Sequence, residues 1–292
     1  MEVSRRLDAK GDRVFDIELS AGTIEYEDTG GDGPVLVFIH GLLMDGTAWR
    51  NVVEQLRGTY RCIAPTWPLG SHRIPMRPEA DLTLVGMGHL IGEFLDALDL
   101  RDVTLIQNDW GGAQAFFAVS NPERVSRLVL AACEAFDNYP PGPVKRLLPL
   151  VKLPGGVRLL MAVLGTKFGR RGPGTWGWMS KRPVPGPVMD AWFRPATVDR
   201  NIRRDLAKYA LSAPPKQQLL EIAAKAAQFS GPVLVVWATE DRMMPRDHGR
   251  RLAEAFPDAR LVEIDDSYTL LAEDQPEKLT AAIEEFLTAT AR

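Results

Sequence analysis

The chain has 292 residues, of which 45% are apolar and 25% are charged, and its formal net charge is −3. This length allows one large α/β domain or two small domains with a sizeable buried core. A slightly acidic chain lacks the basic field that a nucleic acid or an anionic membrane requires, so we expect neither as a partner.

The sequence shows no sign of export, of a membrane span or of a bound metal. Residues Met1 to Lys10 are polar and charged, and no apolar run approaches the roughly 20 residues that span a bilayer. Cys62 and Cys133 do not form a CxxC pair, and the four histidines lack metal-ligand spacing. We therefore expect a cytoplasmic protein that uses neither a metal nor another cofactor.

Strand-like and helix-like segments alternate along most of the chain. Apolar or alternating runs predict eight strands, at 15–19, 24–28, 35–39, 61–64, 103–107, 127–131, 233–237 and 260–264. Amphipathic stretches predict helices at 49–56, 84–98, 112–120, 247–256 and 276–289. The first two strands are close enough to form a hairpin. The later alternation is typical of a mostly parallel sheet with flanking helices.

Residues 136–226 interrupt this alternation. They contain helical pieces without strands between them, many prolines, and the tryptophans Trp176, Trp178 and Trp192. We interpret the segment as a helical cap inserted into an α/β core that is made of residues 1–135 and 227–292.

The stretch from 105 to 112, Leu-Ile-Gln-Asn-Asp-Trp-Gly-Gly, predicts an apolar strand that enters a sharp turn and then a helix. Such a turn lifts its central side chain, here Asp109, above the sheet and directs the next backbone N–H groups at whatever that side chain attacks. Gly111 and Gly112 are the small neighbours that the turn needs, whereas Gln107 is larger than expected. The alternative is that Asp109 only caps the following helix.

Further candidate residues follow the ends of other predicted strands. His40 and Gly41 follow the third strand, His72 lies in the loop after the fourth, Glu134 follows the sixth and Asp241 follows the seventh. Ligands of α/β folds bind at the carboxyl edge of the sheet, onto which such loops open.

These motifs, in this order, resemble the α/β-hydrolase fold. Asn108-Asp109-Trp110-Gly111 is most similar to the branch with an aspartate nucleophile, the haloalkane dehalogenases and epoxide hydrolases. The resemblance covers nearly the whole chain and implies a mostly parallel eight-stranded sheet and a small-molecule substrate. It implies that Asp109 displaces halide or opens an epoxide to form an alkyl ester. It also implies an oxyanion hole formed by the backbone N–H groups of Leu42 and Trp110, with His40 in a structural role.

The resemblance further implies that the Trp110 indole holds a leaving halide together with a second donor. The asparagine that often follows the His-Gly pair is Leu42 here, so Trp176, Trp178 or Trp192 would have to serve. For each of these three, the alternative is packing within the cap. Epoxide hydrolases instead use two cap tyrosines, and the cap contains only Tyr139 and Tyr209.

The base that the family uses to activate water is missing. In the final loop the family's Gly-His pair corresponds to Tyr268-Thr269, and Thr269 lies 28 residues after Asp241. A threonine hydroxyl cannot act as a general base near neutral pH. We expect Asp241 to be the orienting acid, with Glu134 as the alternative. His72 is either a substitute base or an ordinary loop histidine.

We therefore predict an α/β-hydrolase-fold hydrolase that acts on a small apolar substrate through Asp109, with an atypical or missing water-activating base. The alternative is a non-hydrolytic member of the fold, namely a lyase, isomerase or transferase that uses Asp109 as acid or base, or a ligand-binding pseudoenzyme. Thr269 favours this alternative, whereas the intact Asp109 motif favours a hydrolase. The sequence indicates no particular oligomeric state.

Overall fold

The computed structural model describes residues 3–7 and 13–291, and its centre is a nine-stranded sheet in the order β1-β2-β3-β5-β4-β6-β7-β8-β9. All eight predicted strands are present, and the additional β1 lies at the edge of the sheet beside β2. The strands are β1 (Val3–Leu7), β2 (Arg13–Leu19), β3 (Gly22–Asp28), β4 (Val35–Ile39), β5 (Arg61–Pro65), β6 (Val103–Asp109), β7 (Val125–Cys133), β8 (Val233–Ala238) and β9 (Ala259–Ile264).

The sheet is antiparallel at one side and parallel over the rest. The pairs β1–β2, β2–β3 and β3–β5 are antiparallel, whereas every pair from β5 to β9 is parallel. Within β4, Leu36 and Phe38 pack into one apolar cluster and Val37 and Ile39 into another, because successive side chains of a strand point to opposite faces. Both faces are therefore covered, which explains the continuous apolar runs in the sequence.

Helices cover the two faces of the sheet. α2 and α3 pack on each other within one apolar cluster, while α1 and α14 pack on each other within the other. The five predicted core helices agree with the structure to within one residue at each end. The core helices are η1 (Gly46–Trp49), α1 (Arg50–Leu56), α2 (Leu84–Ala97), α3 (Ala113–Val119), η2 (Pro122–Arg124), α12 (Arg246–Ala255), α13 (Leu271–Asp274) and α14 (Pro276–Ala289).

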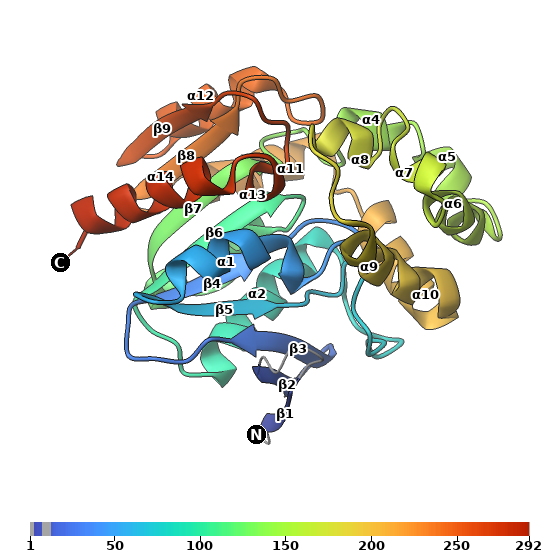
Figure 1. Cartoon of the computed structure of the whole chain (residues 1–292), viewed down its shortest axis with the longest axis horizontal. Coiled ribbons are helices and arrows are strands. Elements are labelled where there is room, and N and C mark those ends of the chain that lie inside the picture. The colour runs from blue at the N-terminus through green and yellow to red at the C-terminus, as the bar shows by residue number, and fades with distance from the viewer. Residues whose placement is uncertain (1–2, 8–12, 292) are drawn as a thin grey trace.

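The segment between β7 and β8 is helical and contains no strand. Figure 1 shows α4 to α10 gathered at one side of the sheet as a separate layer. The helices are α4 (Gly142–Lys145), α5 (Leu148–Val151), α6 (Gly156–Leu164), α7 (Lys167–Arg170), α8 (Trp176–Met179), α9 (Gly186–Val198), α10 (Arg200–Leu211) and α11 (Lys216–Ala226). None of the helices in the described part of the chain is long and apolar enough to cross a membrane.

The last helix of this segment, α11, packs on the core. We assigned residues up to 226 to the cap, but α11 packs against α3 of the core. Leu219, Ile222 and Ala226 lie along one side of α11 and join the same apolar cluster as Phe116 of α3. The helical character of α11 was therefore predicted, but its position was not, because an amphipathic pattern does not say which surface it meets.

Candidate active site

Asp109 lies at the apex of the turn between β6 and α3. Its backbone has a φ of 59°, a left-handed conformation that is strained for a residue with a side chain. α3 begins at Ala113 with Gly112 as its N-cap, so Asp109 is not the cap residue of this helix. Small neighbours are required here, because a Cβ atom on Gly41 would lie 1.9 Å from Oδ2 of Asp109 and one on Gly111 would collide with β4.

Gln107 and Glu134 support this turn from below. The side-chain amide of Gln107 donates to the carbonyl oxygen of Asp109 at 3.0 Å and to the carboxylate of Glu134, and its oxygen accepts the N–H of Ala113. Glu134 also accepts the N–H of Gly112 at 2.8 Å. The large residue at position 107 is thus part of the turn. Glu134, our alternative for the orienting acid, has both carboxylate oxygens bound within the turn.

The carboxylate of Asp109 is buried beside two backbone donors. Burial raises the pKa of Asp109 to about 7; the N–H groups of Trp110 and Leu42 oppose this rise, while the charge of Asp241 adds to it. The two donors are the pair expected to form an oxyanion hole. In this structure they contact the nucleophile candidate itself and favour its ionised form.

Asp241 and Thr269 lie in contact, 28 residues apart in the sequence. The hydroxyl of Thr269 donates to Oδ1 of Asp241 at 2.8 Å, and that oxygen also accepts the N–H groups of Met243 and Met244. Oδ2 of Asp241 is buried and has no hydrogen-bond partner among the described residues. Burial raises the pKa of Asp241 to about 6. The side chain of Asn108 joins this loop to the nucleophile turn, because its amide donates to the carbonyl oxygen of Thr269 at 2.8 Å.

An apolar cavity of about 80 Å³ adjoins Asp109, with core residues on one side and cap residues on the other. Leu42 and Leu43 form part of the core side, and aliphatic residues of α4 to α6 form much of the cap side. The polar groups in the lining are Asp109, Thr175 and the indoles of Trp110 and Trp176. Such a space suits a small apolar substrate that offers few hydrogen-bond partners.

The three cap tryptophans differ in their relation to this cavity. Trp176 lines it, and the indole N–H groups of both Trp176 and Trp110 are buried without a hydrogen-bond partner in the described structure. Trp192 instead donates its N–H to Asp45 at 3.1 Å, and Trp178 is not part of the lining. An indole nitrogen is only a donor, so two of the residues that line this cavity carry a buried donor without an acceptor in the described structure.

The two cap tyrosines lie outside the cavity. Tyr139 and Tyr209 pack their rings against Trp110, with ring centroids 4.9 and 5.4 Å away. The hydroxyl of Tyr209 donates to the carbonyl oxygen of Trp110 at 3.4 Å. They therefore hold Trp110 in place and are not positioned to protonate an epoxide oxygen in the cavity.

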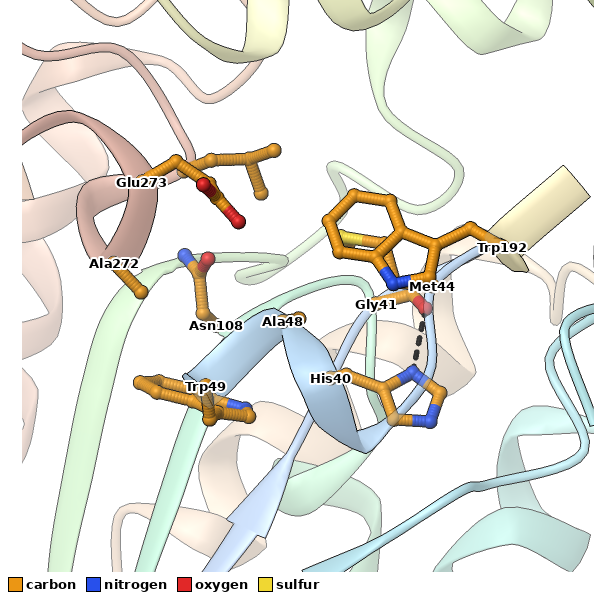
Figure 2. Close-up of a pocket in the computed structure, with 10 residues that line it drawn as sticks. His40, Gly41, Met44, Ala48, Trp49, Asn108, Trp192, Ala272 and Glu273 are labelled. Carbon is orange, nitrogen blue, oxygen red and sulfur yellow. Dashed lines mark hydrogen bonds between the residues drawn. The ribbon is translucent and has the colours of Figure 1, made fainter. Parts of the chain in front are cut away.

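His40 has a structural position beside the turn. Its Nε2 accepts the N–H of Trp67 at 2.8 Å, so Nδ1 carries the hydrogen and donates to the carbonyl oxygen of Gly41 at 2.9 Å. Burial lowers the pKa of His40 to about 4, so the ring is neutral. Figure 2 shows this ring at a second, small cavity of about 10 Å³, together with Asn108 and Glu273. That volume holds about one water molecule and no substrate.

His72 does not take the place of the missing base. Its Nδ1 accepts the N–H of Gly70 at 3.3 Å, and its Nε2 donates to Asp205 of α10 at 3.2 Å. The ring is buried and does not line the cavity beside Asp109. The loop after β5 packs beneath α10, which turns the imidazole toward the cap.

Among the described residues, no group of three or more His, Cys, Asp or Glu side chains could hold a metal.

Sequence reasoning missed the roles of several polar residues around the site. Asn108 and Gln107 hold the turn and the final loop, and Asp205 binds His72. The available signal was that two amide side chains end an otherwise apolar strand. Buried amides need partners, and here those partners belong to other loops.

The comparisons with known proteins agree with this fold. The alpha/beta hydrolase fold family matches residues 34–276, and the chain belongs to this family. It is a hydrolase-fold enzyme related to haloalkane dehalogenases. Haloalkane dehalogenase 2 of Mycobacterium tuberculosis is 28% identical over 280 residues, which are 90% of this chain and 91% of that protein. A haloalkane dehalogenase of Mesorhizobium japonicum is 32% identical over 152 residues, about half of each chain.

Two further similarities complete the comparison. A cis-3-alkyl-4-alkyloxetan-2-one decarboxylase of Xanthomonas campestris is 28% identical over 280 residues, with 90% of this chain and 92% of that protein covered. The crystal structure of haloalkane dehalogenase DbeA from Bradyrhizobium elkani aligns over 99% of this chain and 98% of its own, with a TM-score of 0.76 and 16% identity. The structural likeness confirms the predicted α/β-hydrolase fold.

Proposed function

We propose that Asp109 is a nucleophile that displaces a leaving group from an alkyl carbon of a small apolar substrate. The observation that carries the proposal is the pairing of Asp109 with two unpartnered indole N–H groups, of Trp110 and Trp176, in one apolar cavity. A carboxylate can attack carbon on one side, while the two donors bind the anion that leaves on the other.

The reaction that fits this arrangement is displacement of halide. An oxygen of Asp109 forms a bond to the alkyl carbon as the carbon–halogen bond breaks, and the halide leaves with the bonding electron pair. The N–H groups of Leu42 and Trp110 contact the Asp109 carboxylate and orient it. The indoles of Trp110 and Trp176 donate to the halide, for which the apolar wall offers no other partner.

Hydrolysis of the resulting alkyl ester on Asp109 is the step that lacks a conventional base. The Thr269 hydroxyl donates to Asp241 and offers no basic site of suitable pKa. Asp241 is the candidate for an atypical base, because its Oδ2 is buried and unpaired. A carboxylate without an imidazole is a poor activator of water, so we expect the ester on Asp109 to form and persist.

The test is to incubate the protein with a panel of bromo- and chloroalkanes and to measure intact mass and released halide. The expected result is one alkyl group added and one halide released for each chain, with no adduct in Asp109→Asn. The Thr269→His variant should convert this single event into turnover, because a base contributes roughly 10²–10⁴-fold to such a step. Absence of both the adduct and halide release across the panel would contradict the proposal that Asp109 is a nucleophile.

A second candidate function, a lyase activity, rests on Thr269 and on the name of one relative. The relative's name describes decarboxylation of an oxetan-2-one ring, and it covers 90% of this chain. Such a reaction breaks one carbon–oxygen and one carbon–carbon bond of the ring, gives an alkene and carbon dioxide, and consumes no water. A site without a water-activating base would not be impaired in it. Release of carbon dioxide from a dialkyl oxetan-2-one, lost in Asp109→Asn, would identify this lyase activity.

A further inference from the structure

The cap contains a long stretch without acidic residues. Residues 138–189 include no aspartate or glutamate but contain nine lysines and arginines, although the whole chain has a net charge of −3. Arg170, Lys181 and Arg182 pair with acidic side chains. The other six are exposed and make no salt bridge with any described residue: Lys145, Arg146, Lys152, Arg158, Lys167 and Arg171. This part of the cap is therefore strongly basic.

The same stretch exposes large apolar side chains. Leu153, Leu159, Val163 and Phe168 are at least half exposed, and Phe168 is 91% exposed. Leu159 and Val163 are one turn apart and share the outer side of α6. The inner side of α6 carries apolar residues that line the Asp109 cavity, including Leu160. α6 is therefore apolar on both sides, unlike an ordinary surface helix, which has a polar outer side.

Most of these residues belong to α6, α7 and the turns next to them. Figure 1 shows α5, α6 and α7 at the edge of the molecule, far from the sheet. We call the surface made by residues 152–171, which run from the turn after α5 through α6 and α7, the α5–α7 face. A hollow of about 870 Å³ lies beside α7, and Lys167, Phe168 and Arg171 are part of its lining. Exposed apolar groups thus alternate with unpaired cations on one surface.

We propose that the α5–α7 face docks on an anionic lipid bilayer. An amphipathic surface of this kind lies in the interface, with apolar side chains at the acyl boundary and basic side chains at the headgroup phosphates. Phe168 and Leu159 would insert, while Lys152, Arg158 and Lys167 would bind phosphate. α6, which would meet the bilayer, also lines the Asp109 cavity, so an apolar substrate dissolved in the membrane would have a short path to the site.

Charge argues against a second copy of this chain as the occupant. A two-fold dimer through this face would place the same basic patch of both chains in contact. Like charges that meet across an interface are strongly unfavourable, whereas an anionic bilayer neutralises them. The exposed phenyl and leucyl groups also favour a bilayer over a polyanion. The acyl layer of a bilayer can bury these groups, whereas a polyanion offers only phosphates.

Co-sedimentation with vesicles tests the proposal directly and requires no substrate, so its outcome is separate from that of the alkylation test. The full chain should bind vesicles of equimolar phosphatidylcholine and phosphatidylglycerol at least about tenfold more tightly than pure phosphatidylcholine, and high salt should weaken this binding. The double variants Leu159→Ser with Phe168→Ser, and Lys152→Gln with Arg158→Gln, should each lose most of it. All four side chains are exposed, so thermal melting should stay unchanged.

A matched control removes two exposed cations elsewhere. Arg246 and Arg250 of α12 belong to the core and make no salt bridge with the described residues, so Arg246→Gln with Arg250→Gln should bind vesicles like the wild type. Equal loss in this control, or no preference for anionic vesicles, would overturn the proposal. A dimer in sedimentation velocity that Phe168→Ser dissociates would also overturn it, in favour of a second copy.

Discussion

At the scale of single residues, the chemistry depends on how Asp109 and Asp241 share a buried environment. Both carboxylates are buried, and the charge of Asp241 raises the pKa of Asp109. In a site with an imidazole between such groups, a positive charge could offset this repulsion. Here a neutral Thr269 hydroxyl binds Asp241 instead. The replacement therefore affects the nucleophile as well as the water-activating step.

This environment predicts the pH dependence of alkylation. Only the ionised form of Asp109 is nucleophilic, and burial raises its pKa to about 7, so the rate of adduct formation should rise with pH through neutrality and then level off. In Asp241→Asn the negative charge is gone, so the midpoint should move to lower pH. Time-resolved intact mass at a series of pH values gives both curves. A rate that is constant through neutral pH, or a midpoint that rises in the variant, would contradict this account.

At the scale of elements, the turn between β6 and α3 is held by side chains from neighbouring strands. The strained φ of Asp109 persists because Gln107 ties the end of the strand to the first turn of the helix, and Glu134 receives the N–H groups of the glycines. Burial raises the pKa of Glu134 to about 8, while those N–H groups oppose the rise. Hydrogen bonds of the surrounding residues thus stabilise the strained backbone conformation of Asp109.

Removal of this support should destabilise the fold. Glu134→Ala leaves the donors of Gln107, Gly111 and Gly112 buried without an acceptor, and the free energy of unfolding should fall by roughly 3 kcal/mol. In Glu134→Gln, which keeps one acceptor oxygen, the free energy of unfolding should fall by less. Urea unfolding measures both, with Glu254→Ala on the exposed side of α12 as the control. A loss in Glu134→Ala no larger than in the control would show that Glu134 does not support the turn.

At the scale of the whole molecule, the cap is attached to the core through a buried polar contact. Asp205 of α10 is fully buried and accepts hydrogen bonds from His72 and from the N–H of Met76, both in the loop after β5. This contact joins the roof of the cavity to the sheet. The contact therefore contributes to the stability of the cap and the core together.

Asp205→Ala should loosen the cap. It leaves the His72 ring and the N–H of Met76 buried without their acceptor, and each unsatisfied donor costs about 1–3 kcal/mol. The expected results are a lower urea midpoint and faster proteolysis within the cap. Asp190→Ala, which removes a mostly exposed partner of Arg170 in the same cap, should change stability little. Similar effects of the two variants would mean that the His72–Asp205 contact does not hold the cap.

Much of the core was predictable from the sequence because its elements obey local rules. Continuous apolar runs mark strands covered on both faces, and five amphipathic patterns mark the core helices to within one residue. The turn at Asp109 was predictable for the same reason, since glycines are required where side chains would collide. Asp241 and Thr269 follow adjacent parallel strands, which brings the two side chains into contact.

Other features depended on partners that are distant in the sequence. Three cap tryptophans are equivalent in sequence, and only the packing of α8 brings the Trp176 indole to the cavity. His72 was a candidate base until its ring proved to bind Asp205.

The sequence by itself therefore determined the sheet and the strained turn at Asp109. These depend on backbone geometry and on the periodicity of apolar residues, which are local properties of a chain. The tertiary structure alone decided which donors face Asp109, what Glu134 and His72 bind, and where α11 packs. Side-chain hydrogen bonds and helix packing are settled by the surfaces that meet when the chain folds, and those surfaces come from distant segments.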